Sequence, residues 1–277
     1  MSVLDDIVAG VAEDLEARRR TVPLEQMRQR ARAAAPALDA FAALGGGDVR
    51  EDTLRVIAEV KRSSPSKGAL AEITDPASLA SSYETGGAAV ISVLTEERRF
   101  GGSLADFDAV RAAVDIPLLR KDFTVDEYQI WEARAHGADL VLLIVAALDD
   151  TRLQEFLNLT HELGMNALVE THTAEEIDRA VAVGAKIIGV NVRNLKTLDV
   201  DRSVFASLAS SIPASAVVVA ESGVRDAADV GHYASEGANA VLVGEALVRH
   251  NDPAATIAEF TRTGAQALAA RRVHGKG

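Results

Sequence analysis

Eight short aliphatic runs alternate with segments of helical periodicity after residue 47. The runs are Leu54–Val60, Ala88–Leu94, Pro117–Arg120, Asp139–Val145, Ala167–Val169, Lys186–Val192, Ala216–Ala220 and Ala240–Val243. Most of the segments between them begin near a helix-capping residue and end at glycine, as from Asp75 to Gly86. Strands that alternate with helices in this way form parallel sheets. Eight such units in about 225 residues predict an α/β fold, the (β/α)8 TIM barrel.

A doubly wound open sheet is the alternative fold for the same order of elements. Such a sheet usually carries the pattern G-x-G-x-x-G in the turn after a strand. None of the eight runs is followed by that pattern. The sequence therefore favours the closed barrel.

The first 47 residues have a different pattern. Apolar residues recur at helical spacing from Val3 to Leu15, and a second helix is expected from about Leu24, interrupted near Pro36, to Leu44. Three consecutive glycines at 45–47 then break the pattern. We expect a single domain with an N-terminal helical extension (1–47) that covers the barrel, the barrel itself (48–270) and a flexible tail (271–277).

Composition limits the classes of function. Hydrophobic residues make up 48% of the 277 residues but aromatic residues only 4%, so the core must be aliphatic. The absence of cysteine excludes disulfides and thiolate chemistry. A net charge of −12 disfavours nucleic acid and anionic membranes as partners. No segment has the pattern of a signal peptide or a membrane span, and we expect a cytoplasmic protein.

Unusual polar residues gather where the expected strands end. The active sites of such barrels lie at the carboxyl ends of the strands. Alternation along each strand can point seven of these side chains into one ring: Glu59, Lys61, Lys121, Glu170, Asn191, Arg193 and Glu221. A single pair such as Glu59 and Lys61 fits a surface ion pair on an edge strand as well as a catalytic pair. Seven polar residues at one end of a barrel favour an active site.

The loops after the last two strands predict a phosphate site. Small residues at a helix N-terminus expose backbone N–H groups, and the helix dipole favours an anion there. The candidate phosphate ligands are Ser222, Gly223, Gly244 and Glu245, with Ser64 in the loop after the first strand. Apolar residues near the same strand ends predict a flat apolar pocket beside the phosphate: Pro65, Phe100, Phe123, Leu142, Leu195 and Leu242.

These strand-end motifs resemble those of the indole-3-glycerol phosphate synthase family. The matching stretches follow the family order over about residues 54–250: Ile57-Ala-Glu-Val-Lys-Arg-Ser-Ser-Pro-Ser, Leu119-Arg-Lys-Asp-Phe, Leu142-Leu-Ile-Val, Leu168-Val-Glu, Ile188-Gly-Val-Asn-Val-Arg-Asn-Leu, Val219-Ala-Glu-Ser-Gly and Val241-Leu-Val-Gly-Glu. The resemblance is specific, because motifs at seven of the eight strand ends agree. The helical extension is also similar to that of the family, where it helps to cover the active site.

The resemblance implies a reaction and a set of roles. The phosphorylated small-molecule substrate would be 1-(2-carboxyphenylamino)-1-deoxyribulose 5-phosphate, which closes a ring and loses CO2 and water to give indole-3-glycerol phosphate. Lys121 would be the general acid and Glu170 the general base. Lys61 would lie near the substrate carboxylate, and Glu59 and Glu221 would orient the lysines.

The remaining roles concern binding. By the same resemblance, Asn191 would hold the anthranilate moiety, Arg193 would support the charge of the site, and the residues named above would bind the phosphate and enclose the ring. No metal ion or organic cofactor is implied, and we expect a monomer. In Glu245 only the N–H is expected to serve the phosphate, because a carboxylate beside a phosphate is unfavourable.

Two other functions are compatible with the same residues. In a Schiff-base aldolase of this fold, Lys121 or Lys61 would form an imine with the substrate. A non-catalytic barrel that binds phosphorylated metabolites would need the phosphate loops but not both catalytic groups. A sister barrel, phosphoribosylanthranilate isomerase, would use a cysteine base, and this chain has no cysteine.

Overall fold

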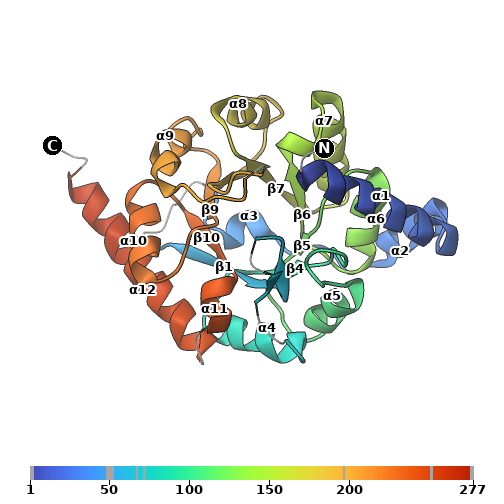
Figure 1. Ribbon diagram of the computed structural model, residues 1–277, viewed down its shortest axis with the longest axis horizontal. Coiled ribbons are helices and arrows are strands. Elements are labelled where there is room, and N and C mark those ends of the chain that lie inside the picture. Colours follow the sequence, from blue (N-terminus) through green and yellow to red (C-terminus); the bar gives the residue numbers. More distant parts are fainter. Residues whose placement is uncertain are drawn as a thin grey trace.

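A closed barrel of eight parallel strands forms the centre of the molecule (Figure 1). The computed structural model describes residues 3–47, 53–66, 68–70, 73–195, 197–249 and 252–274. For residues 272–274 it describes the backbone alone. The barrel strands are β1 (Arg55–Val60), β4 (Val90–Leu94), β5 (Leu118–Lys121), β6 (Leu140–Ile144), β7 (Asn166–Thr171), β8 (Ile187–Asn191), β9 (Val217–Glu221) and β10 (Ala240–Val243). Pairing of β1 with β10 closes the sheet, which confirms the predicted barrel.

Helices follow the strands on the outside of the barrel (Figure 1). They are α4 (Pro76–Thr85), α5 (Leu104–Arg111), α6 (Glu127–Ala135), α7 (Asp150–Glu162), α8 (Ala174–Ala182), α9 (Phe205–Ala209), α10 (Ala227–Ser235), α11 (Glu245–Arg249) and α12 (Pro253–His274), with short 3-10 turns η1 (Val145–Ala147) and η2 (Arg202–Val204). The expected capping residues act as caps: Asp75 accepts from Ser78 N, and Thr173 from Glu176 N.

Two aliphatic layers hold the barrel together. The larger layer lies between the sheet and the helices, and the smaller one fills the inside of the barrel. Ile57, Leu119 and Leu168 belong to the inner layer and are fully buried. The inner layer extends to Leu142 and Leu242, which line the pocket, and polar side chains lie at the carboxyl ends of the strands.

The N-terminal extension runs from one end of the barrel to the other. Its helices are α1 (Val3–Thr21), α2 (Leu24–Ala33) and α3 (Ala40–Ala43). The first helix lies over the mouth of the barrel, α2 packs against α6, and α3 packs Ala40 and the following Leu44 into the inner aliphatic layer. Figure 1 shows α1 and α2 beside α6. The extension therefore contributes residues at both ends of the barrel.

Three segments add detail to the sequence-based expectations. The interruption expected near Pro36 separates α2 from α3, and residues 35–39 have no regular structure, because proline at 36 disfavours helical backbone in the residue before it. The loop after β1 contains a small antiparallel pair, β2 (Ser63–Ser64) and β3 (Gly68–Ala69). Residues 271–274, expected in the tail, continue α12, while 275–277 and the expected barrel start at 48–52 lie outside the described residues.

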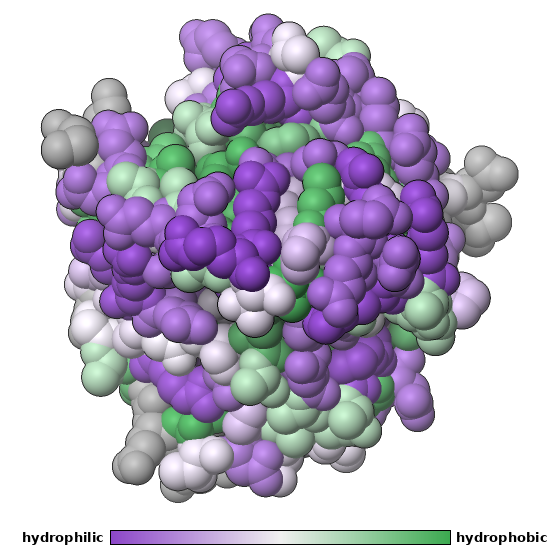
Figure 2. Space-filling view, turned by 90° about the vertical axis from the view of Figure 1, so that its right-hand side faces the viewer, coloured by the Kyte–Doolittle hydropathy of each residue, from purple (hydrophilic) through white to green (hydrophobic). Residues whose placement is uncertain are grey.

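The surface is mainly hydrophilic on the side that carries α1 and α2, with small hydrophobic patches between charged groups (Figure 2). Among the described residues, no helix is both long and apolar enough to cross a membrane.

Candidate active site

One pocket at the carboxyl ends of the strands contains every residue expected at the site. Its charged and amide side chains are Glu59, Lys61, Lys121, Glu170, Asn191, Arg193 and Glu221. The residues expected to bind the phosphate and the ring also line it: Ser64, Ser222, Gly223, Gly244, Glu245, Pro65, Phe100, Phe123, Leu142, Leu195 and Leu242. The barrel thus brings together residues from separate parts of the chain, as the order of strand ends predicted.

Sequence reasoning missed part of the pocket wall. Val3, Leu4 and Ile7 of α1 line the pocket, although the sequence showed only that they share one face of a helix. Leu198 also lines it, from a loop that no periodic pattern describes. The sequence carried no signal that would have located these side chains.

The Glu170 carboxylate is the best-connected group of the site. Lys121 Nζ lies 3.3 Å from Oε2, and Asn191 Nδ2 donates to Oε1 at 3.1 Å. His172 Nε2 lies 3.4 Å from the same Oε1. One carboxylate oxygen therefore faces the lysine, and the other accepts the Asn191 hydrogen bond and lies at ion-pair distance from the His172 ring.

The orientation of Asn191 follows from its neighbours. Its Oδ1 accepts a hydrogen bond from Ser222 Oγ at 2.8 Å and one from the Arg193 backbone N–H at 3.1 Å. An amide oxygen that accepts two bonds leaves the amide nitrogen to donate to Glu170. The guanidinium of Arg193 donates to Leu198 O at 2.9 Å, which anchors the loop after β8 at the rim of the pocket.

Lys121 also lies beside a second carboxylate. Its Nζ is 3.6 Å from Glu221 Oε2, and both carboxylates are almost completely buried. Glu221 Oε1 has no hydrogen-bond partner among the described residues. A Cβ added at Gly189 would lie 2.0 Å from Glu221 Oε1, so only glycine at this position of β8 leaves room for the carboxylate.

Burial and neighbouring charges separate the pKa values of these groups. Burial alone would lower the pKa of Lys121, but the charges of Glu170, Glu221 and Glu59 outweigh burial and raise it. Burial would raise the pKa of Glu170, but Lys121 and His172 lower it overall. Burial and the charge of Glu170 raise the pKa of Glu221. Lys121 is thus held protonated, and Glu170 is the ionised carboxylate of the pair.

Glu59 and Lys61 form an ion pair inside the pocket and not on a sheet edge. The Glu59 side chain is 3% exposed and that of Lys61 is 21% exposed, so the ammonium lies nearer the opening. A Cβ at Gly244 would approach Glu59 Oε1 to 2.8 Å. The glycine before α11 therefore makes room for Glu59 as well as exposing backbone at the expected phosphate site.

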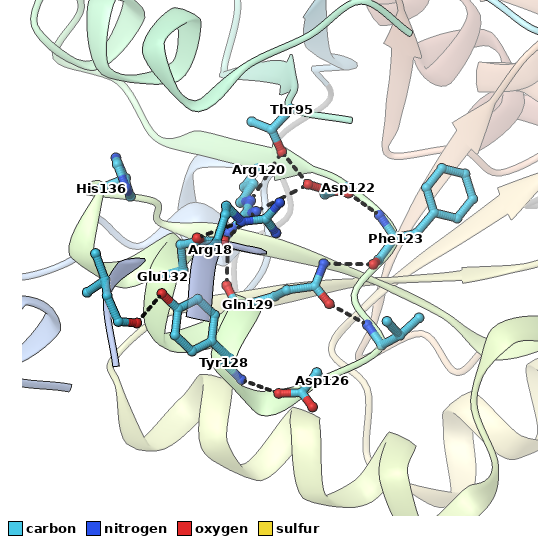
Figure 3. Close-up of polar contacts among 12 residues, drawn as sticks. Arg18, Thr95, Arg120, Asp122, Phe123, Asp126, Tyr128, Gln129, Glu132 and His136 are labelled. Atoms are coloured by element: carbon cyan, nitrogen blue, oxygen red, sulfur yellow. Dashed lines mark hydrogen bonds and ion pairs between the residues drawn. The ribbon is translucent and has the colours of Figure 1, made fainter. Parts of the chain in front are cut away.

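A buried polar network holds the strand that carries Lys121. Arg120 points to the opposite side of β5 and contacts Glu132 Oε2 at 2.9 Å and Asp122 Oδ2 at 3.2 Å (Figure 3). Arg18 of α1 donates to the other oxygen of Glu132 at 2.9 Å. Gln129 Nε2 donates to the backbone oxygen of Phe123 at 2.9 Å. The network fixes the end of β5 and joins it to α1.

The turns expected to bind the phosphate follow β9 and β10 directly. Ser222 and Gly223 both have positive φ, 70° and 80°, and lie directly after β9. The Glu245 carboxylate pairs with Arg249 one turn along α11, which agrees with the expectation that it does not serve the phosphate. Ser64 Oγ lies 3.4 Å from Ser66 Oγ in the small hairpin after β1.

The apolar side of the pocket contains two aromatic rings. The rings of Phe100 and Phe123 have centroids 6.1 Å apart and are tilted by 41°. Leu142 and Leu242 line the pocket from the inner layer of the barrel. A planar aromatic group can lie against this wall with its polar substituents toward the charged ring. Within the described part of the chain, no three His, Asp or Glu side chains are grouped to hold a metal ion.

The fold and this site define the chain as a (β/α)8-barrel enzyme with a buried lysine–carboxylate centre. Residues 4–260 match the family described as indole-3-glycerol phosphate synthase, and the chain belongs to that family. It is 73% identical to the indole-3-glycerol phosphate synthase of Arthrobacter sp. (strain FB24), over 98% of this chain and 100% of the relative. Identity to that of Paenarthrobacter aurescens (strain TC1) is 70% over the same shares.

Solved structures with low sequence identity share the fold. A 3-hexulose-6-phosphate synthase from Salmonella typhimurium is 16% identical, with a TM-score of 0.61 over 79% of this chain and all of that chain. A thiamine phosphate pyrophosphorylase from Pyrococcus furiosus is 15% identical, with a TM-score of 0.59 over 78% of this chain and 97% of that chain. At these identities the likeness concerns the barrel alone.

Proposed function

We propose that this protein converts 1-(2-carboxyphenylamino)-1-deoxyribulose 5-phosphate into indole-3-glycerol phosphate, CO2 and water. The observation that carries the proposal is the position of Lys121, whose Nζ lies between the carboxylates of Glu170 and Glu221. This charged centre adjoins an apolar wall on one side and the turns after β9 and β10 on another. The pocket therefore suits a substrate with an aromatic ring at one end and a phosphate at the other.

Ring closure uses Lys121 as general acid. The ring carbon that bears the carboxylate attacks the ketone carbon, with electrons supplied by the amino nitrogen attached to the ring. The ketone oxygen takes a proton from the Lys121 ammonium as the new carbon–carbon bond forms. CO2 then leaves from the same ring carbon, and its bonding electrons restore the aromatic ring. Lys61, nearer the opening, holds the substrate carboxylate until this step.

Water loss uses Glu170 as general base. The new hydroxyl leaves as water after taking a proton from the Lys61 ammonium, which shares the acid role, and Glu170 removes a proton from the neighbouring methylene carbon to form the double bond of the indole. Glu59 stabilises the positive charge on the lysines and on the reacting nitrogen, and Glu221, whose pKa is raised by burial and by Glu170, orients Lys121. Asn191 orients Glu170 and the anthranilate moiety, and Arg193 holds the rim of the pocket.

The phosphate is bound by Ser64 and by the backbone N–H groups of Ser222, Gly223, Gly244 and Glu245. The turn after β9, with positive φ at Ser222 and Gly223, lines the same pocket as Gly244 and Glu245 at the start of α11, which supports this assignment. The ring is enclosed by the apolar wall: Pro65, Phe100, Phe123, Leu142, Leu195 and Leu242.

Charge on Lys121 favours this reaction over a Schiff-base aldolase. An amine must lose its proton before it attacks a carbonyl. Nearby carboxylates raise the pKa of Lys121, which keeps the amine protonated and suits an acid and not a nucleophile. Borohydride added during turnover should therefore leave no covalent adduct on the protein. A mass increase on Lys121 or Lys61 would support the aldolase.

The direct test is the appearance of indole fluorescence when the protein is mixed with the carboxyphenylamino substrate. Lys121→Ala and Glu170→Gln should each lower kcat by at least about 100-fold, because each removes one proton-transfer group. Circular dichroism should show that both variants stay folded. No product from the folded wild-type protein would reject the function, and full activity in both variants would reject the assigned roles.

The remaining proposals concern the protein in the cell. We expect it to act as a monomer in the cytoplasm, with no nucleic acid or membrane as partner. Light scattering coupled to gel filtration measures the mass against the 29.2 kDa of one chain. A mass of about twice that value would contradict the monomer.

A further inference from the structure

His172 is a buried titratable group that the reaction steps above do not use. It lies directly after β7, two residues beyond Glu170, and its side chain is 10% exposed. Its Nε2 is 3.4 Å from Glu170 Oε1, and its Nδ1 is 3.1 Å from Glu176 Oε2. His172 does not line the pocket. It therefore lies on the side of Glu170 that faces away from the pocket, between the carboxylates of Glu170 and Glu176.

The second carboxylate is itself held in place. Glu176 lies in the first turn of α8, where its backbone N–H donates to the capping Thr173 Oγ1 at 3.2 Å. Glu176 Oε2 also accepts the His172 backbone N–H at 2.7 Å. This arrangement resembles a capping box and fixes the acid that faces the imidazole. The ring of His172 is therefore oriented from the side opposite Glu170.

Both ring nitrogens face carboxylate oxygens: Nδ1 is hydrogen-bonded to Glu176, and Nε2 lies at ion-pair distance from Glu170 without a hydrogen bond among the described residues. A neutral imidazole has one N–H and one lone pair, so one of its nitrogens would direct a lone pair at a carboxylate. The imidazolium form has two N–H groups and suits both contacts. Burial would lower the pKa of His172, but its contacts with Glu170 and Glu176 raise the pKa to about 10. His172 is thus a cation at neutral pH.

Glu170 needs this cation when Lys121 acts. Among the described residues, the cations in contact with Glu170 are Lys121 on one oxygen and His172 on the other. Transfer of the Lys121 proton to the substrate removes the first of these charges. Glu221, the other carboxyl group beside Lys121, supplies no positive charge to Glu170, and burial and Glu170 raise its pKa. Arg179 on α8 does not contact Glu176 or Glu170 in this way. It pairs with Asp150 and donates to the backbone oxygens of Val145 and Leu148 between β6 and α7.

We propose that His172 is a positioning residue for Glu170: held from behind by Glu176, it keeps the Glu170 carboxylate ionised and aimed into the pocket while Lys121 is engaged with the substrate. This inference rests on the proposed function and adds a residue to its machinery. His172 acts through Glu170 and touches no reacting atom.

The test compares His172→Leu, His172→Gln and Glu176→Gln with the wild-type protein in the indole fluorescence assay. His172→Leu should lower kcat by about 10- to 100-fold and change KM by less than about threefold. The substitution displaces the general base Glu170 but leaves the substrate-binding groups in place. Loss of the cation raises the pKa of Glu170, so the acid limb of kcat/KM should move to higher pH. His172→Gln keeps an N–H toward Glu170 and should recover part of kcat.

His136→Gln is the matched control. Its Nδ1 also contacts a carboxylate, that of Asp108, at 2.6 Å, but neither residue lines the pocket. This variant should keep the wild-type kcat and pH profile. Nitrogen NMR provides a readout without turnover, since the His172 ring should remain protonated at pH 8 in the wild-type protein and titrate lower in Glu176→Gln.

The outcomes separate this inference from the proposed function. If the wild-type protein forms no indole product, the function fails whatever His172 does. If the wild-type protein is active, a wild-type kcat and acid limb in the folded His172→Leu variant would overturn the positioning role. Should that variant not fold, His172→Gln and Glu176→Gln decide, and an unchanged acid limb in both would likewise overturn it. A neutral His172 ring at pH 8 would also contradict the proposal.

Discussion

At the scale of single residues, the site depends on small groups that make room for charged ones. Glu170, Glu221 and Glu59 are each at most 3% exposed in their side chains, and all lie within reach of a lysine. Burying a charge without such a partner costs several kcal/mol. Glycines at 189 and 244 are part of the arrangement, because a side chain there would meet a carboxylate oxygen. Loss of either should disturb the chemistry before it disturbs the fold.

Gly189→Ala tests this point. The added methyl would lie 2.0 Å from Glu221 Oε1, so the carboxylate must move away from Lys121. We expect kcat to fall by about tenfold or more and stability to fall by about 1–3 kcal/mol, as for other overpacked sites. Activity assays and urea unfolding measure the two effects.

Gly231→Ala is the control for this substitution. It also adds one methyl group, but in the middle of α10, where the nearest atom is Thr263 Cγ2 at 3.3 Å. It should keep the wild-type kcat, and its stability should change by less than about 1 kcal/mol. Equal kcat values for Gly189→Ala and the wild-type protein would show that Glu221 tolerates displacement.

At the scale of elements, the outer side of β5 is fixed by the ion pairs of Arg120, while Lys121 faces the pocket on the inner side. Alternation along the strand sends Arg120 outward into the network of Figure 3. Glu132 of α6 contacts both Arg120 and Arg18, so one carboxylate links β5, α6 and α1. The helix that lines the mouth is therefore connected to the strand that carries the acid.

Glu132→Leu should destabilise the protein by about 3–5 kcal/mol, because Arg120 stays buried with one of its two carboxylate partners removed. The double variant Arg120→Met/Glu132→Leu should recover part of this loss, because it removes the buried guanidinium while Asp122 keeps its hydrogen bonds from Thr95 Oγ1 and the Phe123 N–H. Chemical unfolding of the two single variants and the double variant measures the coupling. Strictly additive effects would mean that the two residues are not coupled in stability.

The surface ion pair of Arg179 and Asp150 provides the comparison for that experiment. Its side chains are 32% and 78% exposed, in contrast to 3% and 2% for Arg120 and Glu132. Asp150→Asn should cost no more than about 1 kcal/mol. A similar cost for Glu132→Leu would show that water reaches the buried network.

At the scale of the whole molecule, one end of the barrel carries the active site and the other end is closed by apolar packing. The site occupies the carboxyl ends of the strands, and α3 with Leu44 closes the other end through the inner aliphatic layer. The N-terminal extension takes part in both, through α1 at the site and α3 at the closed end. Stability and catalysis can therefore be altered independently.

Leu44→Ala should lower the free energy of unfolding by about 2–5 kcal/mol, because Leu44 is fully buried and its loss leaves a cavity. The same variant should keep the wild-type kcat well below its melting temperature, since Leu44 does not line the pocket. Thermal unfolding and the fluorescence assay check the two parts. A lower kcat in fully folded Leu44→Ala would mean that packing at the closed end of the barrel influences the active site.

The sequence by itself determined the repeating units and the residues at the strand ends, because strand alternation, helical periodicity and caps depend on neighbours a few positions apart. It therefore placed Lys121, Glu170 and Glu221 at one end of a barrel. It did not show that both carboxylates share Lys121, or that His172 stands behind Glu170. Those contacts, and the path of α1 over the mouth, arise only when the sheet closes and brings distant segments together.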